Sequence, residues 1–138
     1  MSEYTTVYRD IPYITDGHER QKLDLYVPVG RDNTPLLIWI HGGAWLQGSK
    51  EGGVPLVYLA EGYAIASINY RLSQHALLPA QLEDCKAAIR WLRSNAVEYG
   101  LDSTRFATWG PSAGGHLVTL LGTTINQPEF DVGENLSV

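Results

Sequence analysis

Two kinds of hydrophobic pattern along the chain predict a mixed β-sheet. In residues 4–9 and 22–29, apolar residues such as Leu23 and Leu25 alternate with polar ones, which is typical of a half-exposed antiparallel pair. Three later segments are almost continuously apolar, as expected of strands that are covered on both faces: residues 35–40, 63–70 and 105–109. The chain therefore combines an early antiparallel pair with strands typical of a parallel sheet.

Three helices are predicted between and after these strands. Residues 79–98 have apolar side chains at three- and four-residue steps, begin at a proline and are followed by Gly100. Residues 113–121 are apolar on most sides, and residues 51–61 can form a short helix despite their early glycines. In the helix of residues 79–98, Cys85 lies on the apolar stripe and is expected to be a core residue, whereas Lys86 and Arg90 fall on other faces.

The order of these elements predicts an α/β fold. We expect a mixed, mostly parallel sheet of about five strands with three helices, and a single domain over residues 1–138. In such sheets the functional surface lies beyond the carboxyl ends of the parallel strands. Residues 41–43 and 110–112 both follow predicted strands, so one fold can bring them together.

Composition and charge exclude several classes of function. The chain has 44% hydrophobic residues and a net charge of −5 without a basic run, which argues against nucleic acid or an anionic membrane surface as a partner. The single cysteine cannot form an internal disulfide, and the four scattered histidines form no metal-binding cluster. The start of the chain does not resemble a signal peptide, and no apolar run could span a bilayer. We therefore expect a cytoplasmic protein.

A G-x-S-x-G pattern follows the last predicted strand: Gly110-Pro111-Ser112-Ala113-Gly114. A strand before it and a helix after it are the setting of a nucleophile elbow, which holds a serine hydroxyl at the carboxyl end of a sheet. Glycine is needed at 110 and 114 because a Cβ atom there would clash with neighbouring backbone. Taken alone, the pattern is equally compatible with a glycine-rich turn that exposes a serine.

Four motifs together give a more specific indication. They are His41-Gly-Gly-Ala-Trp45, Asn69-Tyr-Arg-Leu72, Pro79-Ala-Gln-Leu-Glu-Asp84 leading to Trp91, and Gly110-Pro-Ser-Ala-Gly-Gly-His116. With these motifs the sequence resembles the α/β-hydrolase superfamily, in particular carboxylesterases and lipases of the hormone-sensitive-lipase type and bacterial acetyl-xylan and feruloyl esterases. The resemblance covers about residues 20–125 and corresponds to the N-terminal half of the family's domain.

The resemblance implies a serine carboxylic-ester hydrolase that needs no metal or other cofactor and acts on a small-molecule ester. Ser112 would attack the ester carbonyl, and the N–H groups of Ala113, Gly43 and Ala44 would bind the oxyanion. Gly42 would let the turn after residue 40 pass close to the serine.

The histidines present fit a supporting role better than the role of base. His41 is expected to anchor the turn that follows residue 40, and His116 to pack or form hydrogen bonds one helical turn after Ser112. His18 is expected to be a solvated turn residue, and His75 either lines the acyl pocket or is solvated. Tyr70 and Trp45 could line the substrate cleft or be ordinary rim aromatics.

The family's catalytic acid and base are not found in this sequence. In this fold they follow the serine in the order Asp or Glu, then His, but His116 is the one histidine after Ser112. We therefore expect a truncated or split esterase, in which strand 105–109 is a sheet edge that pairs with a second copy or a complementary chain. Two alternatives stay open: a non-catalytic remnant that serves as a binding or structural module, and a chain that is active alone with His41 or His116 as the base.

Overall fold

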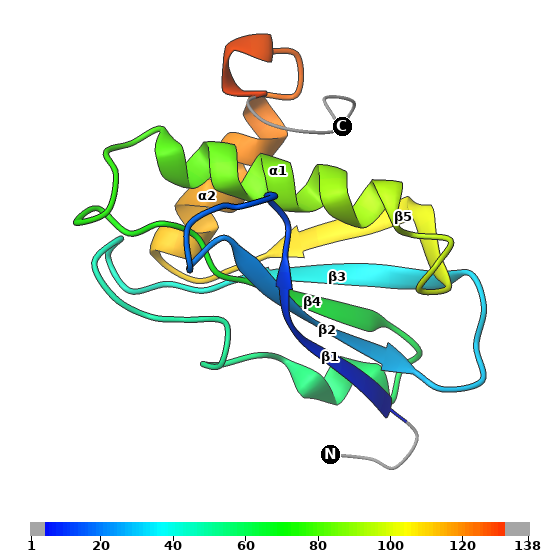
Figure 1. Ribbon diagram of the computed structural model, residues 1–138. Coiled ribbons are helices and arrows are strands. Elements are labelled where there is room, and N and C mark those ends of the chain that lie inside the picture. The colour runs from blue at the N-terminus through cyan, green and yellow to red at the C-terminus, as the bar shows by residue number, and fades with distance from the viewer. Residues whose placement is uncertain (1–4, 132–138) are drawn as a thin grey trace.

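A computed structural model describes residues 5–131, and its five strands form one sheet in the order β1-β2-β4-β3-β5 (Figure 1). The strands are β1 (Thr5–Pro12), β2 (Lys22–Pro28), β3 (Thr34–Ile40), β4 (Ala64–Ile68) and β5 (Leu101–Trp109). β2 is antiparallel to both β1 and β4, whereas β3 is parallel to β4 and β5. The predicted mixed, mostly parallel sheet of an α/β-hydrolase is therefore confirmed.

Two α-helices cover one face of this sheet. α1 (Ala80–Ser94) and α2 (Ala113–Thr123) pack against each other on that face, while the 3₁₀ turn η1 (Leu56–Leu59) lies on the opposite face (Figure 1). A second 3₁₀ turn, η2 (Pro128–Phe130), follows α2. The main core lies between the sheet and α1, where Leu25, Ile38 and Leu92 are fully buried. Burial of this continuous apolar layer is the main stabilising term of such a fold.

The predicted helix over residues 51–61 is wrong. Only residues 56–59 form a single 3₁₀ turn. Gly53 has a φ of +68°, which lies outside the helical region, and Pro55 lacks the amide that a continuing helix would need. Residues 5–131 therefore form two α-helices and two short 3₁₀ turns in place of the three helices expected.

Two cations of α1 that lie off its apolar stripe, as predicted, are nevertheless buried. Lys86 and Arg90 are buried, with 2% and 0% of their surface exposed. Residues 124–131 cover this part of the helix: Lys86 Nζ donates to Thr124 O at 2.7 Å and lies 3.2 Å from a carboxylate oxygen of Asp131. Arg90 Nη1 lies 3.8 Å from the same carboxylate oxygen. The helix thus has a second buried face beside its apolar stripe.

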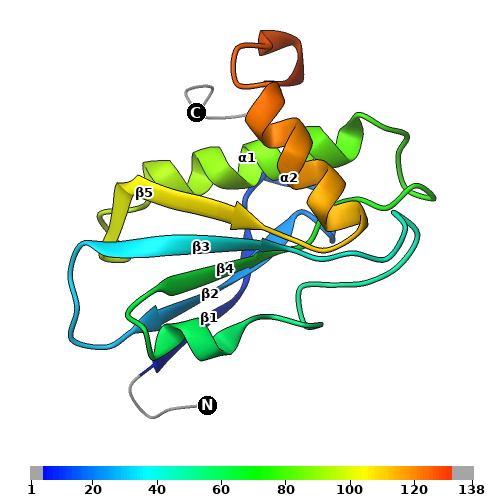
Figure 2. The same cartoon turned by 180° about the vertical axis from the view of Figure 1, so that it is seen from behind.

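β5 forms an edge of the sheet within residues 5–131, as predicted (Figure 2). From Arg105 to Trp109 exposed and half-buried positions alternate, and Trp109 is 44% exposed, so the prediction that this strand is covered on both faces is wrong for residues 5–131. An apolar pocket of about 340 Å³ lies beside β5 and is lined by Leu37, Tyr58, Tyr63, Ala107 and Trp109. No helix in the described part of the chain is long and apolar enough to cross a membrane.

Candidate active site

Ser112 lies on a sharp turn between β5 and α2. Its backbone has φ 51° and ψ −120°, a left-handed conformation that L-residues rarely adopt, and the residue is exposed. Such strain persists only where the surrounding structure imposes it, and it is common at functional sites. The strand-turn-helix setting of the G-x-S-x-G pattern is therefore present in three dimensions.

The two glycines of the pattern have a clear steric reason. A Cβ atom on Gly110 would lie 2.2 Å from the carbonyl oxygen of Ile40, and one on Gly114 would lie 2.0 Å from the same oxygen. Neither distance is possible for real atoms, so both positions require glycine. The turn and the first residues of α2 therefore pack directly on the carboxyl end of β3.

The segment that leaves β3 passes beside Ser112. A Cβ atom on Gly42 would lie 2.9 Å from Pro111 O and 3.4 Å from Ser112 Cβ. After Gly42 the chain forms a tight turn, in which Gly43 O accepts hydrogen bonds from the amides of Leu46 and Gln47 at 3.0 and 3.1 Å. We call residues 42–48 the glycine turn.

Among the amides near Ser112 that have no hydrogen-bond acceptor within residues 5–131, three are those that the sequence predicted as oxyanion donors. They belong to Gly43 and Ala44 in the glycine turn and to Ala113 at the start of α2. Gly43 and Ala44 both have positive φ values, 125° and 52°, so the turn does not continue the direction of β3. Free amides at a helix start and in an adjoining turn are the groups that can stabilise an oxyanion.

His41 lies behind this turn and is 3% exposed. Its Nδ1–H donates to Gly42 O at 2.7 Å, and its Nε2 lies 3.1 Å from Nη2 of Arg20. Burial lowers the pKa of His41, the nearby Arg20 charge adds to this effect, and the bond to Gly42 opposes it. With both ring nitrogens engaged, the geometry of His41 is that of an anchor for the turn.

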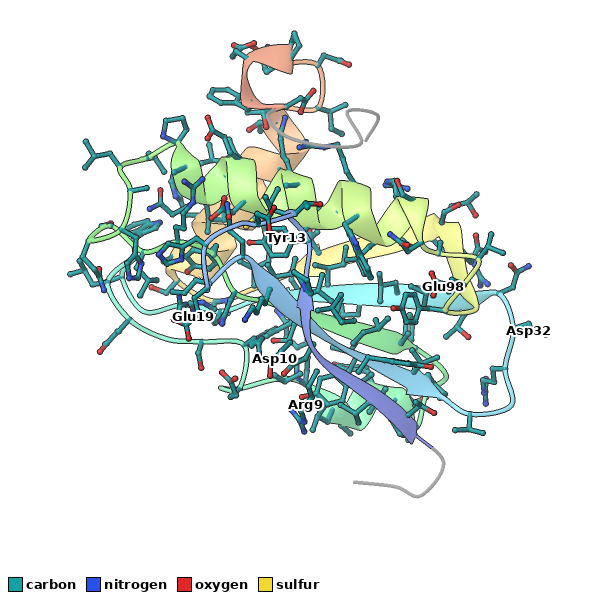
Figure 3. All side chains as sticks on the ribbon, in the orientation of Figure 1. Arg9, Asp10, Tyr13, Glu19, Asp32 and Glu98 are labelled. Atoms are coloured by element: carbon teal, nitrogen blue, oxygen red, sulfur yellow. The ribbon has the colours of Figure 1, made fainter. Side chains whose placement is uncertain are left out.

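No local pattern in the sequence indicates the role of Arg20. It lies in the link between β1 and β2, residues 13–21, in which Figure 3 labels Tyr13 and Glu19. Its guanidinium nevertheless contacts His41, Gly48 O at 3.0 Å and Tyr70 O at 2.9 Å. Contacts between residues so far apart in the chain leave no local pattern.

Tyr70 does not line a cleft, contrary to both interpretations of the sequence. It is fully buried, its ring stacks on His41 with centroids 4.4 Å apart, and its hydroxyl donates to His41 O at 2.8 Å. Burial raises the pKa of this phenol. Tyr70 therefore packs against His41 and helps to hold it in place.

The other three histidines, all within residues 5–131, are exposed and form no hydrogen bond with the Ser112 hydroxyl. The exposed ring of His116 meets Trp45 edge to face at 5.4 Å, and the exposed rings of His18 and His75 lie 4.7 Å apart. No imidazole among the described residues forms a hydrogen bond with the Ser112 hydroxyl. Nor do three or more metal-ligating side chains gather within residues 5–131.

The arrangement of an elbow serine on β5 and a glycine turn after β3 agrees with comparisons to known proteins. The BD-FAE family model matches residues 23–137, which is most of the chain. The chain belongs to the BD-FAE family. This places it among the α/β-hydrolase esterases, as the sequence motifs predicted, and the match covers their N-terminal portion.

Relatives of this BD-FAE chain are named as esterases. It is 42% identical to the esterase LipC of Mycobacterium tuberculosis over 99 residues, which cover 70% of this chain and 25% of LipC. It is 36% identical to the esterase LipQ of the same organism over 137 residues, covering 94% of this chain and 32% of LipQ. A solved truncated form of a carbohydrate esterase from gut microbiota superposes with a TM-score of 0.88 at 33% identity, covering 96% of this chain and 52% of that one. The chain thus spans a third or less of the curated relatives and about half of the solved esterase.

Proposed function

We propose that this chain provides the nucleophile and the oxyanion hole of a serine carboxylic-ester hydrolase. The observation that carries the proposal is the position of Gly42, whose hypothetical Cβ would lie 3.4 Å from Ser112 Cβ. This contact brings an exposed serine on a strained turn and a turn with free amides into one site. The esterase names of the BD-FAE relatives support ester hydrolysis as the reaction.

In this proposal Ser112 Oγ attacks the carbonyl carbon of a small-molecule carboxylic ester. Negative charge then develops on the carbonyl oxygen, and the amides of Gly43, Ala44 and Ala113 donate to it. The loss of one such donor typically reduces the rate about 100- to 1000-fold. Because these donors are backbone groups of a helix start and of a tight turn, they need no rearrangement during the reaction.

The base and the acid of the triad are proposed to come from outside residues 5–131. A serine hydroxyl is a weak nucleophile at neutral pH until a base accepts its proton. His41 cannot do so while Arg20 donates to its Nε2 and its Nδ1–H is bound to Gly42 O. The relatives are much longer than the stretch matched here, which leaves room in them for further triad residues.

One observation favours the alternative of a non-catalytic binding or structural module. The Ser112 hydroxyl receives no support from an imidazole in the described region. A remnant of this kind would keep the elbow and the glycine turn as parts of the fold. The two proposals differ in whether hydrolysis depends on Ser112.

Hydrolysis of a short-chain p-nitrophenyl ester separates the two proposals. The 138-residue chain is assayed alone and together with the segment of LipQ that follows the matched region, each with Ser112→Ala as the control. Ester hydrolysis that occurs in either sample, with or without the LipQ segment, and is lost in Ser112→Ala supports the esterase. If the wild-type chain hydrolyses the ester no faster than Ser112→Ala in both samples, the result contradicts the esterase and supports the non-catalytic module.

We also propose that the free edge of β5 pairs with another strand, in a second copy of the chain or in a complementary chain. An unpaired strand edge beside apolar side chains favours association. Sedimentation over a range of concentrations tests this, since a species that stays monomeric at high concentration contradicts pairing between copies.

A further inference from the structure

The guanidinium group of Arg20 connects the two ends of the glycine turn. Its Nη2 donates to Gly48 O at 3.0 Å and to His41 Nε2 at 3.1 Å, and its Nε donates to Tyr70 O at 2.9 Å. Gly48 is the last residue of the turn, and His41 directly precedes the first. One side chain from the β1–β2 link therefore holds both ends of the turn and joins them to the segment after β4.

The contact with Arg20 determines where the proton of His41 lies. A guanidinium has only donors, so His41 Nε2 must accept, and the ring proton of the neutral imidazole must be on Nδ1. The other side of the ring requires the same form, because Nδ1 lies 2.7 Å from Gly42 O, which can only accept. Both neighbours thus select the Nδ1–H tautomer.

The bond from His41 to Gly42 lies at the point where the two ends of the turn meet. A Cβ atom on Gly48 would lie 2.3 Å from Gly42 O and 2.6 Å from His41 Nδ1. Gly48, with a φ of +90°, is therefore packed against this hydrogen bond. Rotation of the imidazole would disturb the Gly42 carbonyl and Gly48 together.

We propose that Arg20 is a positioning residue for the oxyanion hole: it fixes His41 as the Nδ1–H tautomer and so holds the glycine turn beside Ser112. In this arrangement the amides of Gly43 and Ala44 stay unpaired and available. The role of the turn in hydrolysis rests on the proposed function, whereas the Arg20–His41 contact does not.

NMR of the 138-residue chain with ¹⁵N-labelled imidazoles tests the contact without any activity. The wild-type chain is expected to show His41 as a single tautomer, protonated at Nδ1 and unprotonated at Nε2. In Arg20→Met the Nε2 lone pair loses its donor and a nearby positive charge, so a mixture of tautomers and a titration midpoint at higher pH are expected. The other charged group that acts on His41 is Glu51, which is unchanged in both chains.

Arg71→Met is the matched control. Arg71 is also a partly buried arginine with several hydrogen bonds, but they go to Asp84 and not to His41. This variant is expected to lose stability while the His41 tautomer and titration stay as in the wild type. A tautomer change in Arg71→Met as large as in Arg20→Met would mean that general loosening is responsible, which overturns the proposal.

The NMR measurement of the His41 tautomer in the wild-type chain tests the proposal even if Arg20→Met does not fold. A wild-type His41 that is protonated at Nε2, or that exchanges between tautomers, contradicts the proposal directly. In the ester assay, Arg20→Met is expected to lower kcat by up to about 100-fold with little change in KM, as for a small displacement of catalytic groups. Absence of Ser112-dependent hydrolysis would refute the proposed function and leave the NMR result to stand by itself.

Discussion

Gly114 and Ile40 approach so closely that a Cβ atom on Gly114 would lie 2.0 Å from Ile40 O. The first belongs to the helix that follows the serine, and the second ends the strand that leads into the glycine turn. This contact sets the distance between the two halves of the candidate site. The contribution of this contact to the stability of the chain can be measured.

Gly114→Ala is expected to destabilise the chain by about 1–3 kcal/mol or more, because the added methyl group forces α2 away from β3. Gly122→Ala is the control in the same helix, since nothing lies within 4 Å of a Cβ atom there. That variant should gain about 0.5–1 kcal/mol from the better helix propensity of alanine. Urea unfolding measures both, and equal effects at the two positions would contradict the packing described.

Ser112→Gly is expected to be more stable than Ser112→Ala by about 1 kcal/mol. Both variants lack the hydroxyl, but only glycine adopts φ 51° and ψ −120° without strain. The difference in their free energies of unfolding therefore measures the strain at the elbow. If the two variants unfold at the same urea concentration, the serine backbone is not strained.

Lys50→Met is expected to cost about 3–5 kcal/mol, because it leaves a buried carboxylate without its main partner. The Lys50 ammonium is 2.9 Å from Asp24, whose side chain is fully buried, and 2.8 Å from Asp10 (labelled in Figure 3). Asp24→Asn removes the buried charge, so the double variant should be destabilised by less than the sum of the two single variants. Additive losses in urea unfolding would show that the pair does not interact.

The same cluster makes stability depend on pH in the acid range. Hydrogen bonds from Ser49 and Lys50 lower the pKa of Glu51 from 4.5 to about 2. A carboxylate with a lowered pKa stabilises the fold above its unfolded value, so this contribution is lost as the pH falls from about 4.5 to 2. Urea unfolding across this range should show a smaller pH dependence in Lys50→Met than in the wild type, and an unchanged slope would contradict the assignment.

Cys85 is expected to resist thiol reagents in the native chain. It is fully buried on α1, and burial raises the pKa of its thiol. Ellman's reagent should therefore react at the rate at which the core opens, and quickly once guanidinium unfolds the chain. Rapid reaction under native conditions would place the cysteine outside the core.

The sequence predicted those features that depend on local pattern. Alternation identified β1 and β2 as an antiparallel pair. The predicted half-exposure of β2 is wrong, because β2 lies between β1 and β4 and is buried on both faces. Continuous apolar runs identified β3 and β4, and the glycines around Ser112 indicated the elbow because they report a close approach of backbones. The family motifs then gave the fold and the class of relatives. The single domain and the cytoplasmic location stay predictions.

What the sequence did not predict depends on contacts between distant segments. Lys86 and Arg90 look solvent-facing on an isolated helix, and only the path of residues 124–131 buries them. The contact of Arg20 with His41 joins the β1–β2 link to the end of β3. The burial of Tyr70 against His41 has the same cause, since a stack between two segments leaves no periodicity in the sequence.

Covalent trapping of Ser112 with a p-nitrophenyl phosphonate tests the central claim most directly. The phosphonyl oxygen imitates the oxyanion of ester hydrolysis. With the LipQ segment of the ester assay present to supply the base, peptide mass spectrometry should find the adduct on Ser112, and NMR should show the largest amide shifts at Gly43, Ala44 and Ala113, the proposed oxyanion donors. Faster modification of another hydroxyl, or an adduct on Ser112 that leaves these three amides unmoved, would contradict the claim that they form one site.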